Sequence, residues 1–348
     1  MIKSLTSLRG IFILFIFFHH CLNLYTGGGT MAVSFFFVLG GFGLTLGYKN
    51  RVIASEFSYK QYLSKRIIKF YPLHWICLLA SLPFALLSFS FIQIPVFAIN
   101  ASLLQSWIPI KEVYFSYNAV SWYLANTLFF AVVFPLLLKW IVNASTKGKT
   151  LIAMGFVVVY AVVAMLIPKE MHHAILYISP YIRLTDFVLG VFLALGFLKL
   201  KERPIVFLKN SILSQSLVFV LIALLVLESC VLSEDVVLFA PVYWPFVAML
   251  ILTTSVSEVI WGGQKLLSNK YLLRLGELSF TIFLIHQLIL RYSSVFFGKI
   301  LHIENILVYV IFTFVLTILV SAVVEKYILK PITQWLTKRI QPSMTAHS

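Results

Sequence analysis

Long apolar stretches recur along the whole of this 348-residue chain, and they restrict the folds that it can adopt. A stretch of about 20 apolar residues crosses the hydrocarbon core of a bilayer as an α-helix. In lipid every backbone N–H and C=O group needs a partner within the protein, so only helices and closed barrels cross a membrane. These stretches are of helical length and lack the short alternating pattern of barrel strands. We therefore predict an all-α polytopic membrane protein with about ten transmembrane helices. The expected spans are residues 7–25, 31–48, 73–92, 118–140, 150–167, 176–198, 213–232, 237–256, 275–297 and 305–328.

The composition supports this fold class and limits the partners. Hydrophobic residues make up 61% of the chain and charged residues only 11%, which is more apolar chain than a soluble core takes up. The formal net charge is +15, a value that would suggest nucleic acid in a soluble protein. In a membrane protein the simpler explanation is basic cytoplasmic loops that anchor the topology beside the lipids. We therefore expect no nucleic-acid partner.

The distribution of the 27 lysines and arginines predicts the orientation of the chain. Most of them lie at the N-terminus, after every second expected span and at the C-terminal end, whereas few lie in the other connections. The positive-inside rule then places both termini in the cytoplasm. We expect one transmembrane domain over residues 1–340 and a short tail over residues 341–348. The longest connection on the opposite side, about residues 93–117, is expected to be interfacial and partly structured.

Arg9 and His20 lie in the first apolar stretch with ten residues between them. On an α-helix this separation is about three turns, a rise of roughly 16 Å, and it returns to within about 20° of the same face. Ionisable groups in a membrane helix are costly and usually face a cavity or a partner. The pair predicts a polar line that runs inward from one membrane surface and ends on a group able to take a proton. The alternative is a neutral packing histidine that a neighbour satisfies.

Several further segments follow in a characteristic order. They are the Phe-rich run 35–42 with its close-packing glycines, the basic run 65–72, the stretch 121–136 with Trp122 and Pro135, the segment 183–190 that begins with Arg183, the segment 275–286 that ends in His286, and the closing run 325–331. Together with Arg9-Gly10 and His20, these segments resemble the acyltransferase type 3 family of bacterial membrane acyltransferases.

The resemblance implies both a reaction and residue roles. It implies transfer of an acyl group, usually acetyl, from a cytoplasmic coenzyme A thioester to a hydroxyl of a cell-surface glycan or of its lipid-linked precursor. The expected location is the bacterial cytoplasmic (inner) membrane. His20 corresponds to the essential histidine of the family and Arg9 to its basic partner, and Arg66 and Lys69 fall on the Arg-x-x-Arg motif.

The chain departs from the family pattern at three places. The second basic position is Lys69 in place of arginine, and Gly40 stands where the family usually has a serine. Thr127 occupies the place of a glutamate that often follows in the fourth span, so a carboxylate that would orient the histidine is missing. Asn126 is a candidate for a neutral version of that role.

Acyl transfer to an alcohol needs a base, an acyl donor bound next to the alcohol, and a site that excludes bulk water. Histidine has a pKa suited to a base near neutral pH, so we assign the base to His20. Coenzyme A carries phosphates, and Arg66 with Lys69 is the expected anchor for acetyl-CoA. The alternative for these two cations is a cytoplasmic collar that touches lipid phosphates. No cysteine or histidine spacing of a metal site is present in the sequence, and we expect no metal.

Five residues are candidates for binding the acceptor. Arg183 lies near the start of its span on the sparsely charged side, where it would contact the acceptor or pair with Asp186. Trp122 and Tyr123 would stack on the acceptor or anchor a helix at the membrane interface. Asn126 and His286 complete the set, with a packing histidine as the alternative for His286.

Two other classes of function compete with acyl transfer. A transporter or flippase would carry its charged residues along a substrate path, but we find no paired inverted halves with interrupted helices. A non-catalytic sensor or scaffold of the same fold is the third hypothesis, and Thr127 in place of the glutamate keeps it open. The sequence also lacks a Gly-x-Ser-x-Gly elbow, so direct transfer is favoured over a serine acyl-enzyme.

Overall fold

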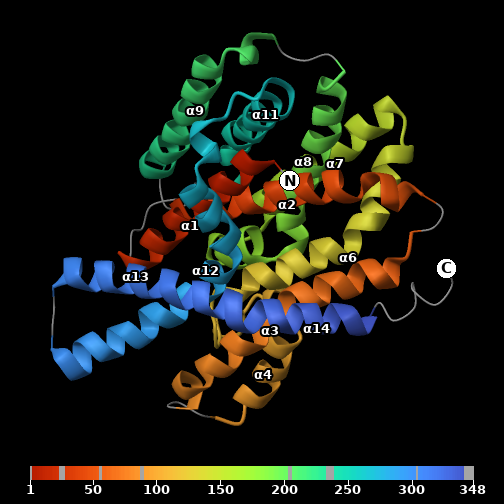
Figure 1. Ribbon diagram of the computed structural model, residues 1–348. Helices are drawn as coiled ribbons and strands as arrows, with labels where there is room; N and C mark the ends of the chain where they lie inside the picture. The colour runs from red at the N-terminus through yellow and green to blue at the C-terminus, as the bar shows by residue number, and fades with distance from the viewer. Residues whose placement is uncertain are drawn as a thin grey trace. The chain divides into compact units, whose positions relative to one another are not determined.

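The computed structural model describes residues 2–22, 28–54, 57–86, 90–202, 206–232, 239–302 and 305–340. The regular structure of these residues is entirely helical (Figure 1). The expected tail over 341–348 lies outside the described residues. The prediction of an all-α chain is therefore confirmed over the part of the chain that the structure describes.

Ten helices of the described residues are long and apolar enough to cross a membrane, which confirms the predicted number of spans. They are α1 (Lys3–Cys21), α2 (Gly28–Ile53), α3 (Tyr59–Leu86), α6 (Ser121–Asn143), α7 (Thr146–Leu166), α8 (Pro180–Leu200), α9 (Ser211–Val231), α11 (Trp244–Trp261) with η5 (Ala240–Tyr243) before it, α12 (Lys270–Val295) with η7 (Phe296–Leu301) after it, and α13 (Ile306–Val323) with η8 (Val324–Leu329) and α14 (Lys330–Ile340) after it.

The expected start of the third span, residue 73, is wrong. Helix α3 begins at Tyr59, so the basic run 65–72 lies inside the helix rather than before it. Lysine and arginine are good helix formers, and their long stems lie along apolar surface while the charged heads reach water. The charged residues lower the mean hydropathy of the first turns of α3. The hydropathy pattern therefore did not predict that the helix begins before the apolar stretch.

The connection over residues 93–117 is partly structured, as predicted, and its interfacial position stays a prediction. It contains α4 (Gln93–Ala101), η1 (Gln105–Trp107) and α5 (Lys111–Tyr114). Shorter elements join the other spans: η2 (Lys169–Met171), η3 (His173–Ile178), η4 (Val206–Lys209) and η6 (Leu266–Ser268).

The chain divides into two compact units, and each is described by itself. Unit 1 comprises Met1–Ser55 with Val133–Ser279, and unit 2 comprises Glu56–Val132 with Phe280–Ser348. Helices α6 and α12 contribute residues to both units.

Unit 1 is organised around the packing of α2 on α8, and the glycines of the Phe-rich run allow it. A Cβ atom on Gly41 would collide with the carbonyl oxygen of Phe187, and one on Gly190 with that of Val38. The two backbones therefore approach closely, as the sequence predicted for this run. Helix α2 also packs on α1, where the ring of Phe35 stacks on that of Phe12 with centroids 3.8 Å apart.

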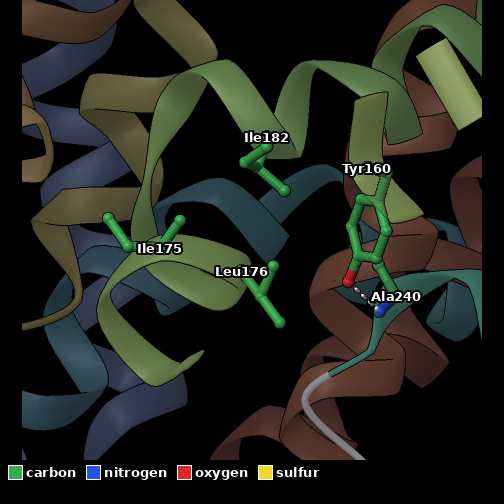
Figure 2. Close-up of a cluster of buried hydrophobic side chains, with 5 residues drawn as sticks. All are labelled: Tyr160, Ile175, Leu176, Ile182 and Ala240. Atoms are coloured by element: carbon green, nitrogen blue, oxygen red, sulfur yellow. Dashed lines mark hydrogen bonds between the residues drawn. The ribbon is translucent and has the colours of Figure 1, made fainter. Parts of the chain in front are cut away.

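A smaller hydrophobic cluster lies beside the start of α8 in unit 1. Its members are Tyr160, Ile175, Leu176, Ile182 and Ala240 (Figure 2). The hydroxyl of Tyr160 accepts a hydrogen bond of 3.1 Å from the backbone N–H of Ala240, shown as the dashed line. This bond ties α7 to η5, and the cluster thereby fixes the surroundings of the next residue on α8, Arg183.

In unit 2 the connection from α3 to α6 is tied to α12. The side chain of Asn118 donates to the carbonyl of Leu284 at 2.9 Å, and the backbone N–H of Val120 donates to the side-chain oxygen of Gln287 at 3.1 Å. Tyr62 of α3 donates its hydroxyl to the carbonyl of Ala131 on α6 at 3.0 Å. These bonds fix the start of α6, which carries Trp122 and Tyr123.

Candidate active site

One continuous helix, α1, carries both Arg9 and His20. Both side chains are partly exposed, and His20 lies in the last turn before the helix ends at Cys21. Arg9 donates a hydrogen bond from Nη2 to the hydroxyl of Ser279 on α12 at 2.9 Å, within unit 1. The sequence did not predict this partner, although Ser279 lies in the segment 275–286 that the family pattern singled out.

The backbones of α1 and α12 meet next to Arg9. A Cβ atom on Gly276 would collide with the carbonyl oxygen of Thr6, and one on Gly10 would lie 2.9 Å from the backbone nitrogen of Gly276. Only glycine at these two positions permits this approach. The contact places Ser279, one helical turn after Gly276, within reach of the guanidinium of Arg9.

The N-terminus of α1 is capped by a carboxylate from another helix. Glu258 of α11 accepts hydrogen bonds from the backbone N–H of Lys3 at 2.8 Å and of Ser4 at 2.6 Å, and from the hydroxyl of Ser4. The first amides of a helix lack partners within it, and its N-terminal end is electropositive, so a carboxylate is the favoured cap. Glu258 lies 254 positions away from Ser4 in the sequence, so helix spacing does not predict this cap.

Two neighbouring histidines end α1. The rings of His19 and His20 lie 5.2 Å apart at 70°. The ring of His19 packs on the start of α2, where a Cβ atom on Gly29 would lie only 2.8 Å from it. His19 therefore packs on α2. Both histidines are partly exposed, and the choice of His20 as the base stays a prediction.

Arg183 is fully buried in unit 1 and has several partners. Its Nε forms an ion pair with Asp186 at 3.1 Å, which is the pairing that the sequence offered as one alternative. Its Nη2 donates to the hydroxyl of Ser34 at 3.1 Å, and its guanidinium lies 5.1 Å from the ring centre of Phe37. Trp244 donates its indole N–H to the second oxygen of Asp186 at 2.5 Å. Arg183 is therefore held by residues of α2 and of its own helix α8, and Trp244 of α11 fixes its partner Asp186.

Arg66 and Lys69 lie on α3 in unit 2, one turn apart. Arg66 is half-buried with its guanidinium 5.2 Å from the ring centre of Tyr62, and Lys69 is exposed. The spacing puts both cations on the same side of the helix. The pair presents positive charge of the kind that phosphates bind, and the choice between a donor anchor and a lipid-binding collar stays a prediction.

The acceptor candidates of unit 2 are mostly buried. Trp122 is 4% exposed and Asn126 is 0% exposed, so both side chains lie inside the packed helices, and the role of Trp122 stays a prediction. Tyr123 is partly exposed, and its ring lies 4.7 Å from that of Phe283 on α12. Phe283 also lies 6.0 Å from the ring of His286, so the structure brings Tyr123 and His286 to one aromatic group.

His286 and Thr127 both bond to carbonyls of their own helices. Nδ1 of His286 lies 2.7 Å from the carbonyl oxygen of Phe283, the contact expected of a packing histidine. The hydroxyl of Thr127 donates to the carbonyl of Tyr123 at 2.8 Å, which does not replace the missing carboxylate. A role of His286 in acceptor binding stays a prediction.

Comparison with known proteins identifies the family. The model of the acyltransferase domain family, acyltransferase type 3, matches residues 2–326. The chain is also similar to the acyltransferase MdmB of Streptomyces mycarofaciens, with 26% identity over 290 residues that cover 78% of this chain and 70% of that protein. No solved structure matches the chain. The chain belongs to the acyltransferase type 3 family, and it is a multi-pass membrane protein.

Proposed function

We propose that this protein is an O-acyltransferase that moves an acyl group, acetyl in the first instance, from acyl-CoA to a hydroxyl of a cell-surface polysaccharide or of its lipid-linked precursor. Family membership supports acyl transfer in general. The observation that carries the residue roles is the single helix α1, which is capped at one end by Glu258, joined through Arg9 to Ser279, and ends in the partly exposed His20.

His20 acts as the general base in this proposal. It removes the proton of the acceptor hydroxyl as the alcohol oxygen attacks the thioester carbonyl carbon, which forms a tetrahedral intermediate. The carbon–sulfur bond then breaks, and the proton on the imidazole passes to the coenzyme A thiolate that leaves. The new ester and the free thiol balance the reaction, and no acyl-enzyme is formed.

Arg9 and the basic pair of α3 have separate roles. Arg66 and Lys69 bind the phosphates of coenzyme A on the cytoplasmic side, through charge-assisted hydrogen bonds. Arg9 holds α1 against α12 through Ser279 and keeps a positive charge on the helix that carries the base. This division predicts that changes at Arg66 and Lys69 act on donor affinity, whereas changes on α1 act on the rate of transfer.

Sided membrane vesicles test the proposed direction of transfer. Radiolabelled acetyl-CoA does not cross a bilayer, so it reaches the cytoplasmic face only in inverted vesicles that also contain the native acceptor. We expect label in the glycan fraction of inverted vesicles and none in right-side-out vesicles. Equal labelling in both, or labelling only in right-side-out vesicles, contradicts cytoplasmic donor binding. Glycan movement without label transfer would support a flippase.

A further inference from the structure

Polar side chains from several elements of unit 1 lie near Arg183 or near Tyr243, which is itself within electrostatic range of Arg183. We call them the Arg183 cluster: Ser34 of α2, Tyr177 of η3, Arg183 and Asp186 of α8, Glu228 of α9, Tyr243 of η5 and Trp244 of α11. The guanidinium of Arg183 lies 5.7 Å from the ring centre of Tyr177. Tyr243 lies within electrostatic range of Arg183, Tyr177 and Glu228. A cluster of this composition is unusual inside an apolar helical protein.

Three polar atoms of the cluster have neither a hydrogen-bond partner nor an ion-pair partner among the described residues. They are Nη1 of Arg183, the hydroxyl of Tyr243 and Oε2 of Glu228, and all three atoms are buried. Arg183 and Tyr243 are each 0% exposed. Buried polar groups are nearly always hydrogen-bonded, because an unpaired group keeps the cost of leaving water. The three atoms together are therefore suited to a polar partner that binds among them.

The hydrogen-bonding capacity of the three atoms identifies the kind of partner. The free nitrogen of Arg183 donates, the carboxylate oxygen of Glu228 accepts, and the hydroxyl of Tyr243 does both. Hydroxyl groups of a sugar match this set, because each of them donates one hydrogen bond and accepts others. A purely accepting ligand such as phosphate would satisfy Arg183 but leave Glu228 unpaired.

The charges of the cluster oppose an anionic ligand. The guanidinium of Arg183 is already paired with Asp186, whose other oxygen is held by Trp244. Glu228 adds a second carboxylate without a second cation among the residues of the cluster. An anion would therefore meet uncompensated negative charge in a site of low dielectric, where repulsion is strong. A neutral ligand avoids this repulsion.

The edge of the cluster is partly exposed and aromatic. Arg183, Asp186 and Tyr243 are fully buried, whereas Tyr177, Glu228 and Trp244 are partly exposed. Trp244 is held in place because it packs on the hydrophobic cluster of Figure 2, with its ring 6.1 Å from that of Tyr160. Aromatic rings next to polar groups give an amphipathic ligand both an apolar face and hydrogen bonds.

We propose that the Arg183 cluster binds a neutral sugar of the acyl acceptor, through Nη1 of Arg183, the hydroxyl of Tyr243 and Oε2 of Glu228. Asp186 and Trp244 are positioning residues that hold Arg183 in place. Only the identification of the ligand as the acyl acceptor rests on the proposed function. Recognition of a neutral polyhydroxyl ligand rests on the cluster itself.

Ligand binding by the purified full-length protein tests this site without any acyl donor. The probes are the neutral methyl glycosides of glucose and galactose, each paired with the methyl glycoside of its matched uronate, glucuronate or galacturonate. Thermal unfolding in detergent reports binding, because a ligand of the native state raises Tm. We expect at least one neutral glycoside to raise Tm by about 2 °C or more, and its matched uronate to bind at least about tenfold more weakly.

Variants separate a binding site from a structural network. Tyr243→Phe and Glu228→Gln should each weaken binding of the neutral probe about tenfold or more. Glu228→Gln should also reduce the difference in affinity between the neutral probe and its uronate, because it removes the carboxylate. Tyr181→Phe, at an exposed tyrosine of α8, the helix that carries Arg183, is the control and should bind as the wild type does.

The proposal is overturned if no neutral glycoside binds, if the uronates bind more tightly than their neutral counterparts, or if Tyr243→Phe and Glu228→Gln leave binding unchanged. His20→Ala should keep full binding of the sugar. Sugar binding by a wild-type protein that transfers no acyl group would refute the proposed function while leaving the sugar site intact.

Discussion

Arg9 of α1 donates a hydrogen bond from Nη2 to the hydroxyl of Ser279 on α12 at 2.9 Å. The hydroxyl of Ser279 in turn donates to the carbonyl of Gly276 at 2.8 Å, the residue at which the two helices approach most closely. The guanidinium of Arg9, the hydroxyl of Ser279 and the close helix contact at Gly276 are thus directly linked. This link joins two segments that are separated by most of the chain, on the helix that carries His20.

Ser279→Ala should reduce the rate of acyl transfer. The change removes the acceptor of a hydrogen bond from a charged donor, a bond worth about 1.5–3 kcal/mol, so we expect kcat/KM to fall roughly 10- to 100-fold. Initial rates of label transfer in inverted vesicles measure the effect. Ser293→Ala, at a buried serine further along α12, is the control. Equal activity of Ser279→Ala and Ser293→Ala would show that the bond to Arg9 does not matter.

Glu258→Ala should destabilise the protein by removing the cap of α1. Loss of a helix N-cap costs about 0.5–2 kcal/mol, and here the carboxylate serves two backbone amides and a hydroxyl. Thermal unfolding in detergent should show a lower Tm. Glu277→Ala is the control, because its ion pair with Arg274 is about half exposed, with side chains 47% and 59% accessible, and contributes little. A Tm loss as large in the control as in Glu258→Ala would contradict the capping role.

Gly276→Ala should harm both stability and activity. The new methyl group would collide with the carbonyl oxygen of Thr6, so α1 and α12 must separate, and overpacking of this kind costs about 1–3 kcal/mol. Gly155→Ala on α7 is the matched control, since a Cβ atom there meets nothing within 4 Å. The control should keep or raise Tm, because alanine favours a helix. An unchanged Tm for Gly276→Ala would mean that the two helices do not pack as described.

Arg66→Ala should distinguish donor binding from a lipid-binding collar. If Arg66 binds coenzyme A phosphates, KM for acetyl-CoA rises roughly 10- to 100-fold, and the amount of inserted protein stays constant. Lys69→Arg keeps the charge and should retain activity. A normal KM together with poor membrane insertion of Arg66→Ala would favour the collar.

Hydropathy was enough to predict the number of membrane-spanning helices. It did not predict the ends of a helix that polar residues extend. The number of spans follows from the apolar stretches, and the close packing of Gly41 on α8 follows from the glycines of the Phe-rich run. The start of α3 at Tyr59 did not follow, because lysines and arginines lower the hydropathy of a segment without breaking its helix.

Only those relationships in the candidate site that join residues close together in the sequence could be predicted. Arg9 and His20 share one helix, and Arg183 pairs with Asp186 three residues later; both relationships depend on spacing along the chain. The contacts of Arg9 with Ser279 and of Ser4 with Glu258 join residues more than 250 positions apart. Helix spacing carries no information about such partners, so only the tertiary structure reveals them.

The most direct test of the account is transfer of radiolabelled acetyl from acetyl-CoA to glycan by inverted vesicles that contain His20→Ala. Removal of a general base should lower the rate about 10²- to 10⁴-fold, with the amount of inserted protein and its Tm unchanged. His302→Asn is the control, because His302 is an exposed histidine in the left-handed backbone region, which asparagine tolerates. We predict loss of transfer in His20→Ala and full transfer in His302→Asn. Wild-type transfer by His20→Ala would contradict the assignment of His20 as the catalytic base.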